Sequence, residues 1–263
     1  MNKRLMLVVL IGAASLQLRA QAPKMQAKAS TKASAKAEGP RIDTVAISIL
    51  DRMSAMIGSL GSCSVTVHSN YDITSHYLGL VKHSDEQKLF MKGPSKLLIR
   101  AEGDKGSRIY TYDGATFNYY SVDKNQFGVL QAPATTMEMI DTINKAYGID
   151  FPAADFFYPT FVDDILAEST NLMYLGLTTV DGKECFHIAG TAKDKTFQFW
   201  ISDDAYSLPV KVVIVYTSRE MNPQYEAVLT DWQVNPNLPD ALFEFTAPPN
   251  ARKIKLTASS TKH

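Results

Sequence analysis

Two series of short segments with alternating apolar and polar residues, separated by a helical stretch, restrict the fold of this chain most. Between residues 63 and 68, Cys, Val and Val alternate with Ser, Thr and His, which is the period of a half-buried β-strand. Asn70, Asp72 and Ser75 favour a turn after this strand. Asp113-Gly114 is typical of a two-residue hairpin turn. The other strands predicted for the first series span residues 77–82, 88–91, 96–102, 108–112, 117–122 and 127–130.

The second series follows a region of helical and aromatic sequence. Residues 135–147 have a helical apolar stripe that Gly148 ends, and short helical turns are predicted before Pro159 and over 161–167. Asp181-Gly182 is a second strong hairpin signal. Strands are predicted over 172–180, 184–190, 196–201, 210–216 and 225–234, with a short turn over 238–243 before a last strand.

A further helix precedes the first series, because apolar residues recur at three- and four-residue steps over 43–60, with Asp43 as its N-cap. Short turns imply antiparallel pairing, and a sheet of about ten strands curls because strands twist. Helices must bury their apolar stripes against one face of such a sheet. We therefore predict an α+β, mostly β fold: a curved antiparallel sheet, or half-open barrel, with helices packed in its concavity.

The chain begins with an export signal. Lys3 and Arg4 precede an apolar run over 5–16, and cleavage is expected after Ala20. The run is too short to span a bilayer, which needs about 20 residues. No Cys lies near the cleavage site, so we expect a periplasmic protein without a lipid anchor. The expected divisions are a signal peptide (1–20), a flexible Ala/Lys/Ser linker (21–40), one domain (41–255) and a frayed tail (256–263).

Charge separates the linker from the domain. From Arg41 onward there are 20 Lys and Arg residues against 26 Asp and Glu residues, a net charge of −6. Nucleic-acid binding requires a basic face, so a nucleic-acid partner is not expected. The mature chain also lacks a segment apolar enough to predict a transmembrane span.

The two cysteines, Cys63 and Cys185, leave two alternatives open. An oxidising compartment permits a disulfide between them. Alternatively, both pack as small, buried, apolar residues.

Several stretches carry a resemblance to a known fold. They are residues 147–156 (YGIDFPAADF), 180–187 (VDGKECFH), 199–201 (FWI) with 208–211 (LPVK), 232–234 (WQV) and 243–249 (FEFTAPP). Over residues 42–254 the chain resembles LolA/LolB-like periplasmic lipoprotein carriers, and most closely a family of predicted periplasmic proteins of unknown function assigned to that fold. The resemblance implies an apolar cavity between a half-open barrel and its helices. It implies either a carrier or a sensor of envelope components, and it supplies no catalytic residues.

An aromatic cluster between Pro152 and Pro159 is the candidate site. It could form a lid over an apolar cavity, or it could be ordinary core. The candidate ligand-binding residues, from lid and cavity, are Phe117, Tyr119, Ile140, Ile143, Phe156, Phe157, Phe161, Phe197, Phe199 and Ile214.

Two functions fit this pattern. The first is a carrier or binding protein for a lipid, an acyl chain, an acylated protein or another hydrophobic ligand. The second is an envelope interaction or sensor module with a filled core, which binds a protein partner and no small molecule.

Catalysis is not expected. The spacing of His68, His76 and His83 does not match a zinc site, so neither a metal nor a cofactor is predicted. The sequence contains no G-x-S-x-G, H-E-x-x-H, P-loop or dinucleotide-binding motif. An uncharacterised hydrolase is the third and weakest alternative.

Overall fold

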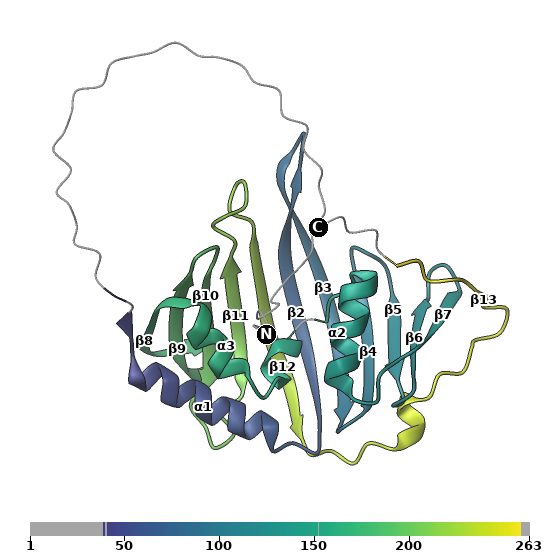
Figure 1. The fold of residues 1–263 in the computed structure, drawn as a ribbon, viewed down its shortest axis with the longest axis horizontal. Helices are drawn as coiled ribbons and strands as arrows, with labels where there is room; N and C mark the ends of the chain where they lie inside the picture. Colours follow the sequence, from purple (N-terminus) through teal and green to yellow (C-terminus); the bar gives the residue numbers. More distant parts are fainter. Residues whose placement is uncertain (1–38, 40, 152, 259–263) are drawn as a thin grey trace, which may run out of the picture.

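A single curved sheet of thirteen strands organises the computed structural model (Figure 1). The strand order is β1-β8-β9-β10-β11-β12-β2-β3-β4-β5-β6-β7-β13, so the two outermost strands do not meet and the sheet stays open. The structure describes residues 39, 41–151 and 153–258. The signal peptide and nearly all of the predicted linker therefore lie outside the described residues.

The elements have the following bounds. The first half contains β1 (Arg41–Ile42), α1 (Thr44–Gly58), β2 (Ser62–Ser75), β3 (Gly79–Lys92), β4 (Lys96–Gly103), β5 (Arg108–Tyr112), β6 (Thr116–Ser121), β7 (Gln126–Gln131) and α2 (Thr136–Tyr147). The second half contains the 3-10 helix η1 (Ala154–Phe157), α3 (Phe161–Glu168), β8 (Ser169–Val180), β9 (Lys183–Ala192), β10 (Thr196–Ser202), β11 (Pro209–Val215), β12 (Gln224–Val234), η2 (Asp240–Phe243) and β13 (Arg252–Lys253).

The predicted fold class is confirmed: the protein is a mostly β, α+β molecule with one large, curved sheet that stays open. The strands from β2 to β12 pair only antiparallel in the described sheet. The two edges differ from the prediction, because β1 joins β8 and β13 joins β7 in parallel. Each of these edge strands has only two residues, too few for a period-two pattern to be visible in the sequence.

Local sequence explains where the two longer helices begin and end. Asp43 caps α1 and accepts a hydrogen bond from the backbone N–H of Val45 at 2.8 Å. Thr135 caps α2 and accepts from the N–H of Glu138, whose carboxylate in turn accepts from the Thr135 hydroxyl. Gly148 ends α2 in the left-handed conformation, with φ of 64°.

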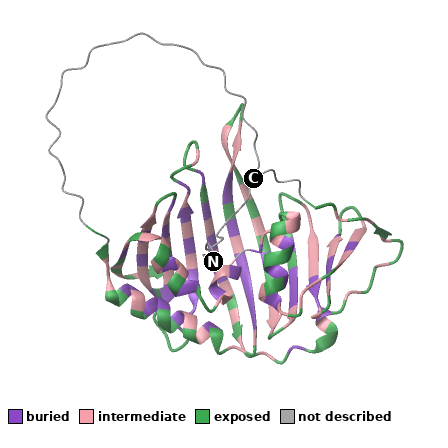
Figure 2. Ribbon diagram, in the orientation of Figure 1, coloured by how far each residue is buried: buried purple, intermediate pink, exposed green. Residues whose placement is uncertain are grey.

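The helices pack against one face of the sheet, which is the concave face. α1, α2 and α3 contribute Leu50, Ile143 and Ile165 to the same hydrophobic core as the sheet residues. Figure 1 shows α1 and α3 in front of the strands from β8 to β12, and α2 in front of β4 and its neighbours. Figure 2 shows buried residues concentrated on the strands behind these helices. The helical cover therefore has two parts, one for each half of the sheet.

The hairpin of β2 and β3 corrects the sequence analysis. The predicted turn over 70–75 is wrong, because β2 runs unbroken to Ser75 and pairs with β3 along its whole length. The polar side chains that suggested a turn are bonded across strands. Asp72 accepts from Lys82 Nζ at 2.7 Å and from the N–H of Gln224 at 2.9 Å. Asn70 accepts from the Ser84 hydroxyl at 2.7 Å.

Candidate functional site

The polarity of the concave face changes along its central strands. Residues paired across neighbouring strands lie side by side on one face, so the sheet register defines rows of side chains. One row is formed by Val65, Leu89, Ile99 and Tyr110. The next is formed by Leu229, Val67, Gln87, Ala101 and Arg108. The third is formed by Ala227, Ser69, Asp85 and Gly103. An apolar floor thus passes into a polar rim within two steps along the strands.

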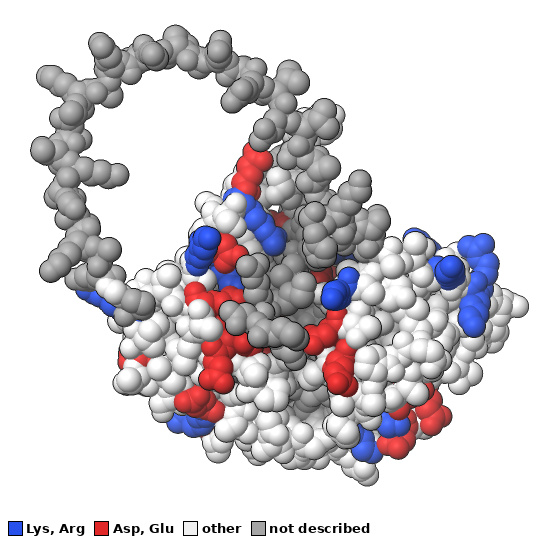
Figure 3. Space-filling view, in the orientation of Figure 1, with Lys and Arg blue, Asp and Glu red and all other residues white. Residues whose placement is uncertain are grey.

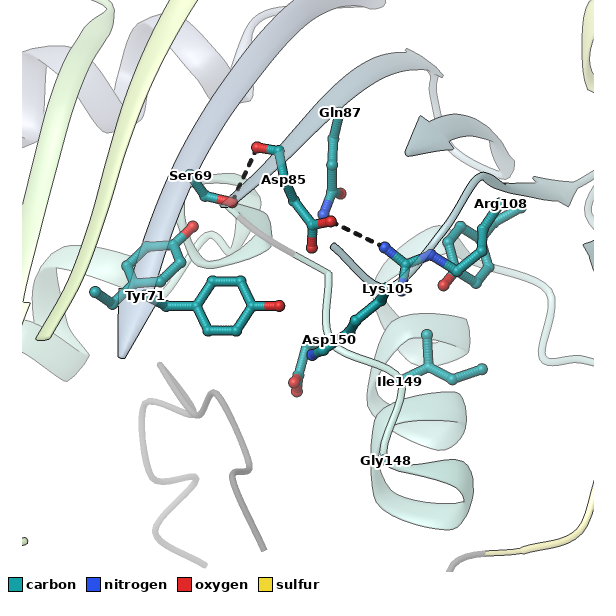
Figure 4. Close-up of a pocket in the computed structure, with 11 residues that line it drawn as sticks. Ser69, Tyr71, Asp85, Gln87, Lys105, Arg108, Gly148, Ile149 and Asp150 are labelled. Atoms are coloured by element: carbon teal, nitrogen blue, oxygen red, sulfur yellow. Dashed lines mark hydrogen bonds and ion pairs between the residues drawn. The ribbon is translucent and has the colours of Figure 1, made fainter. Parts of the chain in front are cut away.

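A cleft of about 200 Å³ lies at this polar rim. Its walls come from β2, β3, β5 and β12, from Lys105 in the turn between β4 and β5, and from the segment that follows α2. Figure 4 shows Tyr71, Asp85, Lys105, Arg108 and Asp150 around one space. The lining residues are Ser69, Tyr71, Asp85, Gln87, Lys105, Arg108, Tyr110, Gly148, Ile149, Asp150 and Tyr225.

A buried ion pair forms the back of the cleft. The Arg108 guanidinium donates to Asp85 Oδ1 at 3.1 Å, and the two side chains are only 14% and 8% exposed. Burial raises the pKa of Asp85, and the charge of Arg108 opposes that rise. Gly103 makes room for this carboxylate, because a Cβ at that position would collide with Asp85 Oδ1 and with the Ser84 backbone. The glycine is therefore required by the close approach of β3, both of its backbone and of the Asp85 carboxylate, and not by a positive φ.

Three polar groups around the cleft are buried without a hydrogen-bond partner among the described residues. They are the hydroxyls of Tyr71 and Tyr225 and the Nε of Arg108. Tyr71 and Tyr225 face each other in the register of β2 and β12 and are 4% and 7% exposed. Lys105 Nζ lies 4.8 Å from the ring centroid of Tyr71. An unpaired buried donor lowers the free energy of unfolding by about 1–3 kcal/mol, so the unpaired groups of this cleft destabilise the folded protein.

The other tyrosine of the cleft, Tyr110, connects it to the apolar floor. Its ring lies 5.6 Å from the ring of Tyr119 and 6.4 Å from that of Phe151, measured between centroids. Burial raises the pKa of Tyr110 to about 12. Its hydroxyl therefore stays protonated at neutral pH.

The ten residues predicted to bind ligand lie in two groups, and none of them lines this cleft. Over the half of the sheet covered by α1 and α3, Phe156, Phe161 and Phe199 pack with centroids 5.3–5.9 Å apart. Phe197, Ile214 and Phe157 belong to the same group, and Phe157 contacts Trp232. Over the other half lie Phe117, Tyr119, Ile140 and Ile143. Eight of the ten are buried, while Tyr119 and Phe157 are partly exposed.

The residues of the cleft were not predicted from the sequence, although the phase of the polar residues along β2 indicated them. Ser69 and Tyr71 have the same parity along β2 as Val65 and Val67, so they share the buried face. A polar residue in the apolar phase of a strand indicates a polar site on that face. The predicted turn over 70–75 broke the strand and concealed this phase.

The cysteines are free thiols in the structure. Three strands separate β9 from β2, so Cys185 and Cys63 are about 19 Å apart along the sheet, far beyond the 7 Å that a disulfide spans. The second alternative, two buried thiols, therefore holds here. Burial raises the pKa of Cys63 to about 12.

Within the described residues, no group of three or more His, Cys, Asp or Glu side chains is placed to hold a metal ion.

Comparison with known proteins identifies a family. Residues 46–257 match the sequence model of a family described as "Predicted periplasmic protein (DUF2092)". An uncharacterized protein of Methanocaldococcus jannaschii is 25% identical over 192 residues, which are 72% of this chain and 49% of that protein. The chain thus spans about half the length of that relative. Among the described residues, no helix is long and apolar enough to cross a membrane.

Solved structures with a similar fold share little sequence with this chain. LprF from Mycobacterium bovis is 14% identical and has a TM-score of 0.45, over 81% of this chain and 100% of that one. An uncharacterized conserved protein from Thermus thermophilus is 12% identical, with a TM-score of 0.45, over 80% and 99%. A LolA superfamily protein from Nitrosomonas europaea is 11% identical, with a TM-score of 0.34, over 76% and 97%. Similarity at this level assigns no ligand to this chain.

Proposed function

The chain belongs to the DUF2092 family of predicted periplasmic proteins, and from that premise we propose that it is a non-catalytic carrier or binding protein for an amphiphilic molecule. The ligand lies on the concave face, with its apolar part between the sheet and the helices. The signal peptide is removed after Ala20, and the mature protein works in the periplasm without a lipid anchor. The partner is a hydrophobic small molecule or an acylated protein.

One observation carries this proposal: the cleft sits where the concave face changes from apolar to polar. The cleft is lined by the central strands and by the segment after α2, and by no residue of α1 or α3. Below it, the row from Val65 to Tyr110 is apolar. A molecule with a polar group and an apolar chain matches both surfaces at once, and each buried CH₂ contributes about 0.8 kcal/mol.

The cleft alone is too small for a complete lipid. Small-molecule pockets enclose about 300–1,000 Å³, whereas this cleft has about 200 Å³. The apolar chain therefore requires the helical cover to move. We assign this movement to the segment of η1 and α3, in which Phe156, Phe157 and Phe161 form the lid over the sheet residues Phe197, Phe199 and Ile214. The second apolar wall is formed by Phe117 and Tyr119 of β6 together with Ile140 and Ile143 of α2.

Native mass spectrometry of the mature protein, purified from the envelope without detergent, tests this function. We expect a bound amphiphile that organic extraction releases. Phe157→Asp should lose it and still fold, because Phe157 is only partly buried. Val45→Asp is the matched control, since Val45 is 49% exposed on α1. A bare mass, together with no displacement of a fluorescent fatty acid, would contradict the proposal.

A second candidate function rests on the open edge of β8. β1 pairs with Asn171 and Leu172, and Asp43 Oδ2 accepts from the N–H of Tyr174 at 3.2 Å. Residues 173–180 carry no charge. On this stretch Met173, Leu175 and Leu177 are 40–56% exposed. Uncharged apolar edges can accept an added strand from a partner. A protein that co-purifies with the wild type but not with Leu175→Lys, with no lipid in either, would favour an interaction module with a filled core.

A further inference from the structure

We infer that the cleft holds a phosphodiester, the head group of the amphiphile, between Tyr71, Tyr225 and Arg108. The inference rests on the proposed function and names the ligand chemistry at its polar end. It follows from which groups in the cleft lack a partner, from the charge that surrounds them and from the position of the cleft.

The unpaired groups are hydrogen-bond donors. Arg108 Nε can only donate, and the two tyrosine hydroxyls, which can donate as well as accept, have no hydrogen-bond partner among the described residues. A partner that accepts from all three groups is rich in acceptor oxygens. The donors come from β2, β12 and β5, which are different strands of the curved sheet. A tetrahedral group presents oxygens in several directions, whereas a carboxylate presents two in one plane.

The charged side chains of the cleft, Arg108 and Lys105 against Asp85 and Asp150, have formal charges that sum to zero, so they disfavour a dianion more than a monoanion. Arg108 and Asp85 neutralise each other in their ion pair. Lys105 contributes one positive charge and is not among the ion pairs of the described residues. Asp150 is the remaining carboxylate, and its Oδ1 accepts from Asn144 Nδ2 at 3.0 Å. This carboxylate opposes a doubly charged phosphate more than a singly charged diester.

The position of the cleft also fits the head group of an amphiphile. The cleft opens at the rim, and the apolar rows begin directly below it. A volume of about 200 Å³ suits a phosphodiester with part of a glycerol unit. An acyl chain attached to that unit would continue over Val67 and Leu89 toward the aromatic clusters. A free phosphodiester would use the same donors but leave the apolar rows without a ligand.

Isothermal titration calorimetry with three probes, each below its micelle concentration, separates these cases. The probes are lauroyl lysophosphatidylglycerol, 1-lauroylglycerol, which has the same chain without the phosphodiester, and glycerophosphoglycerol, which has the head group without the chain. We expect lauroyl lysophosphatidylglycerol to bind at least about tenfold more tightly than either of the others.

The double variant Tyr71→Phe with Tyr225→Phe should remove most of the preference for the phosphodiester. It should not lower the melting temperature, because the lost hydroxyls make no hydrogen bond to any residue that the structure describes. Tyr206→Phe is the control, since Tyr206 is 52% exposed and does not line the cleft. Replacing the diester by lauroylglycerol phosphate, a dianion at alkaline pH, should weaken binding.

Each other outcome has a definite meaning. Equal affinity for the two lauroyl probes, or an unchanged preference in the double variant, would overturn the phosphodiester site and leave the carrier function intact. Binding of glycerophosphoglycerol as tightly as the lysolipid would overturn the amphiphile and retain the site for a free diester. No binding of any probe would overturn both proposals.

Discussion

At the scale of single residues, the protonation of Asp155 makes the folding stability depend on pH. It lies in η1, where burial raises the pKa of its carboxyl to about 7, while the charge of Lys195 opposes the rise. In an unfolded chain the pKa of Asp is about 3.9. Between about pH 4 and pH 7, the Asp155 carboxyl therefore keeps its proton in the folded state and has lost it in the unfolded state. The free energy of unfolding falls as pH rises through this window and then levels off.

Replacing Asp155 by Asn should remove this loss. At pH 8 we expect Asp155→Asn to raise the free energy of unfolding by on the order of 2 kcal/mol, which allows for the partial exposure of the side chain, and at pH 4 to change it little. Urea unfolding at both pH values measures the difference. Asp163→Asn, at an exposed position of α3, is the control. An equal gain at both pH values would show that ionisation of Asp155 is not the cause.

At the scale of elements, one hydrogen bond links the lid to α2. Tyr158, directly after η1, donates to Asp141 Oδ1 of α2 at 2.7 Å. The bond joins the two parts of the helical cover, on either side of the cleft. Asn144 of α2 also donates to the backbone carbonyl of Ile149 at 3.2 Å. The proposed opening of this segment therefore requires that Tyr158 separate from Asp141.

The variant Tyr158→Phe should loosen the lid without unfolding the sheet. A hydrogen bond to a carboxylate at a partly exposed site contributes about 1 kcal/mol, so amides of residues 154–168 should exchange with deuterium about fivefold faster. Amides of β4 and β10 should keep their rates. Uptake of a fluorescent fatty acid should accelerate as well. Unchanged exchange over 154–168, or equal acceleration in the Tyr206→Phe control, would argue against this bond as the latch.

At the scale of the whole molecule, most of the fold followed from periodicity, and the cleft did not. Alternation located the strands, and the Asp181-Gly182 turn has positive φ at both residues, as its sequence predicts. Asp43, Thr135 and Gly148 marked helix ends by local chemistry. The cleft depends on register between strands distant in sequence, such as Tyr71 with Tyr225, which no local pattern encodes.

The packing of the aromatic residues also lay beyond the sequence. An apolar pattern is the same for a filled core and for a cavity, and here the rings of Phe156, Phe161 and Phe199 are in contact.

Figure 3 shows acidic and basic residues interspersed on the face that holds the helices. The absence of a nucleic-acid partner stays a prediction from composition.

A crystal structure of the mature protein with a lysophosphatidylglycerol that carries bromine at the end of its acyl chain tests the central claim most directly. The account predicts the phosphodiester beside Tyr71, Tyr225 and Arg108. It predicts anomalous bromine density on the concave face, between the sheet and the displaced segment of η1 and α3. Lipid on the convex face or along the β8 edge, with the cleft and the aromatic core unchanged, would contradict it.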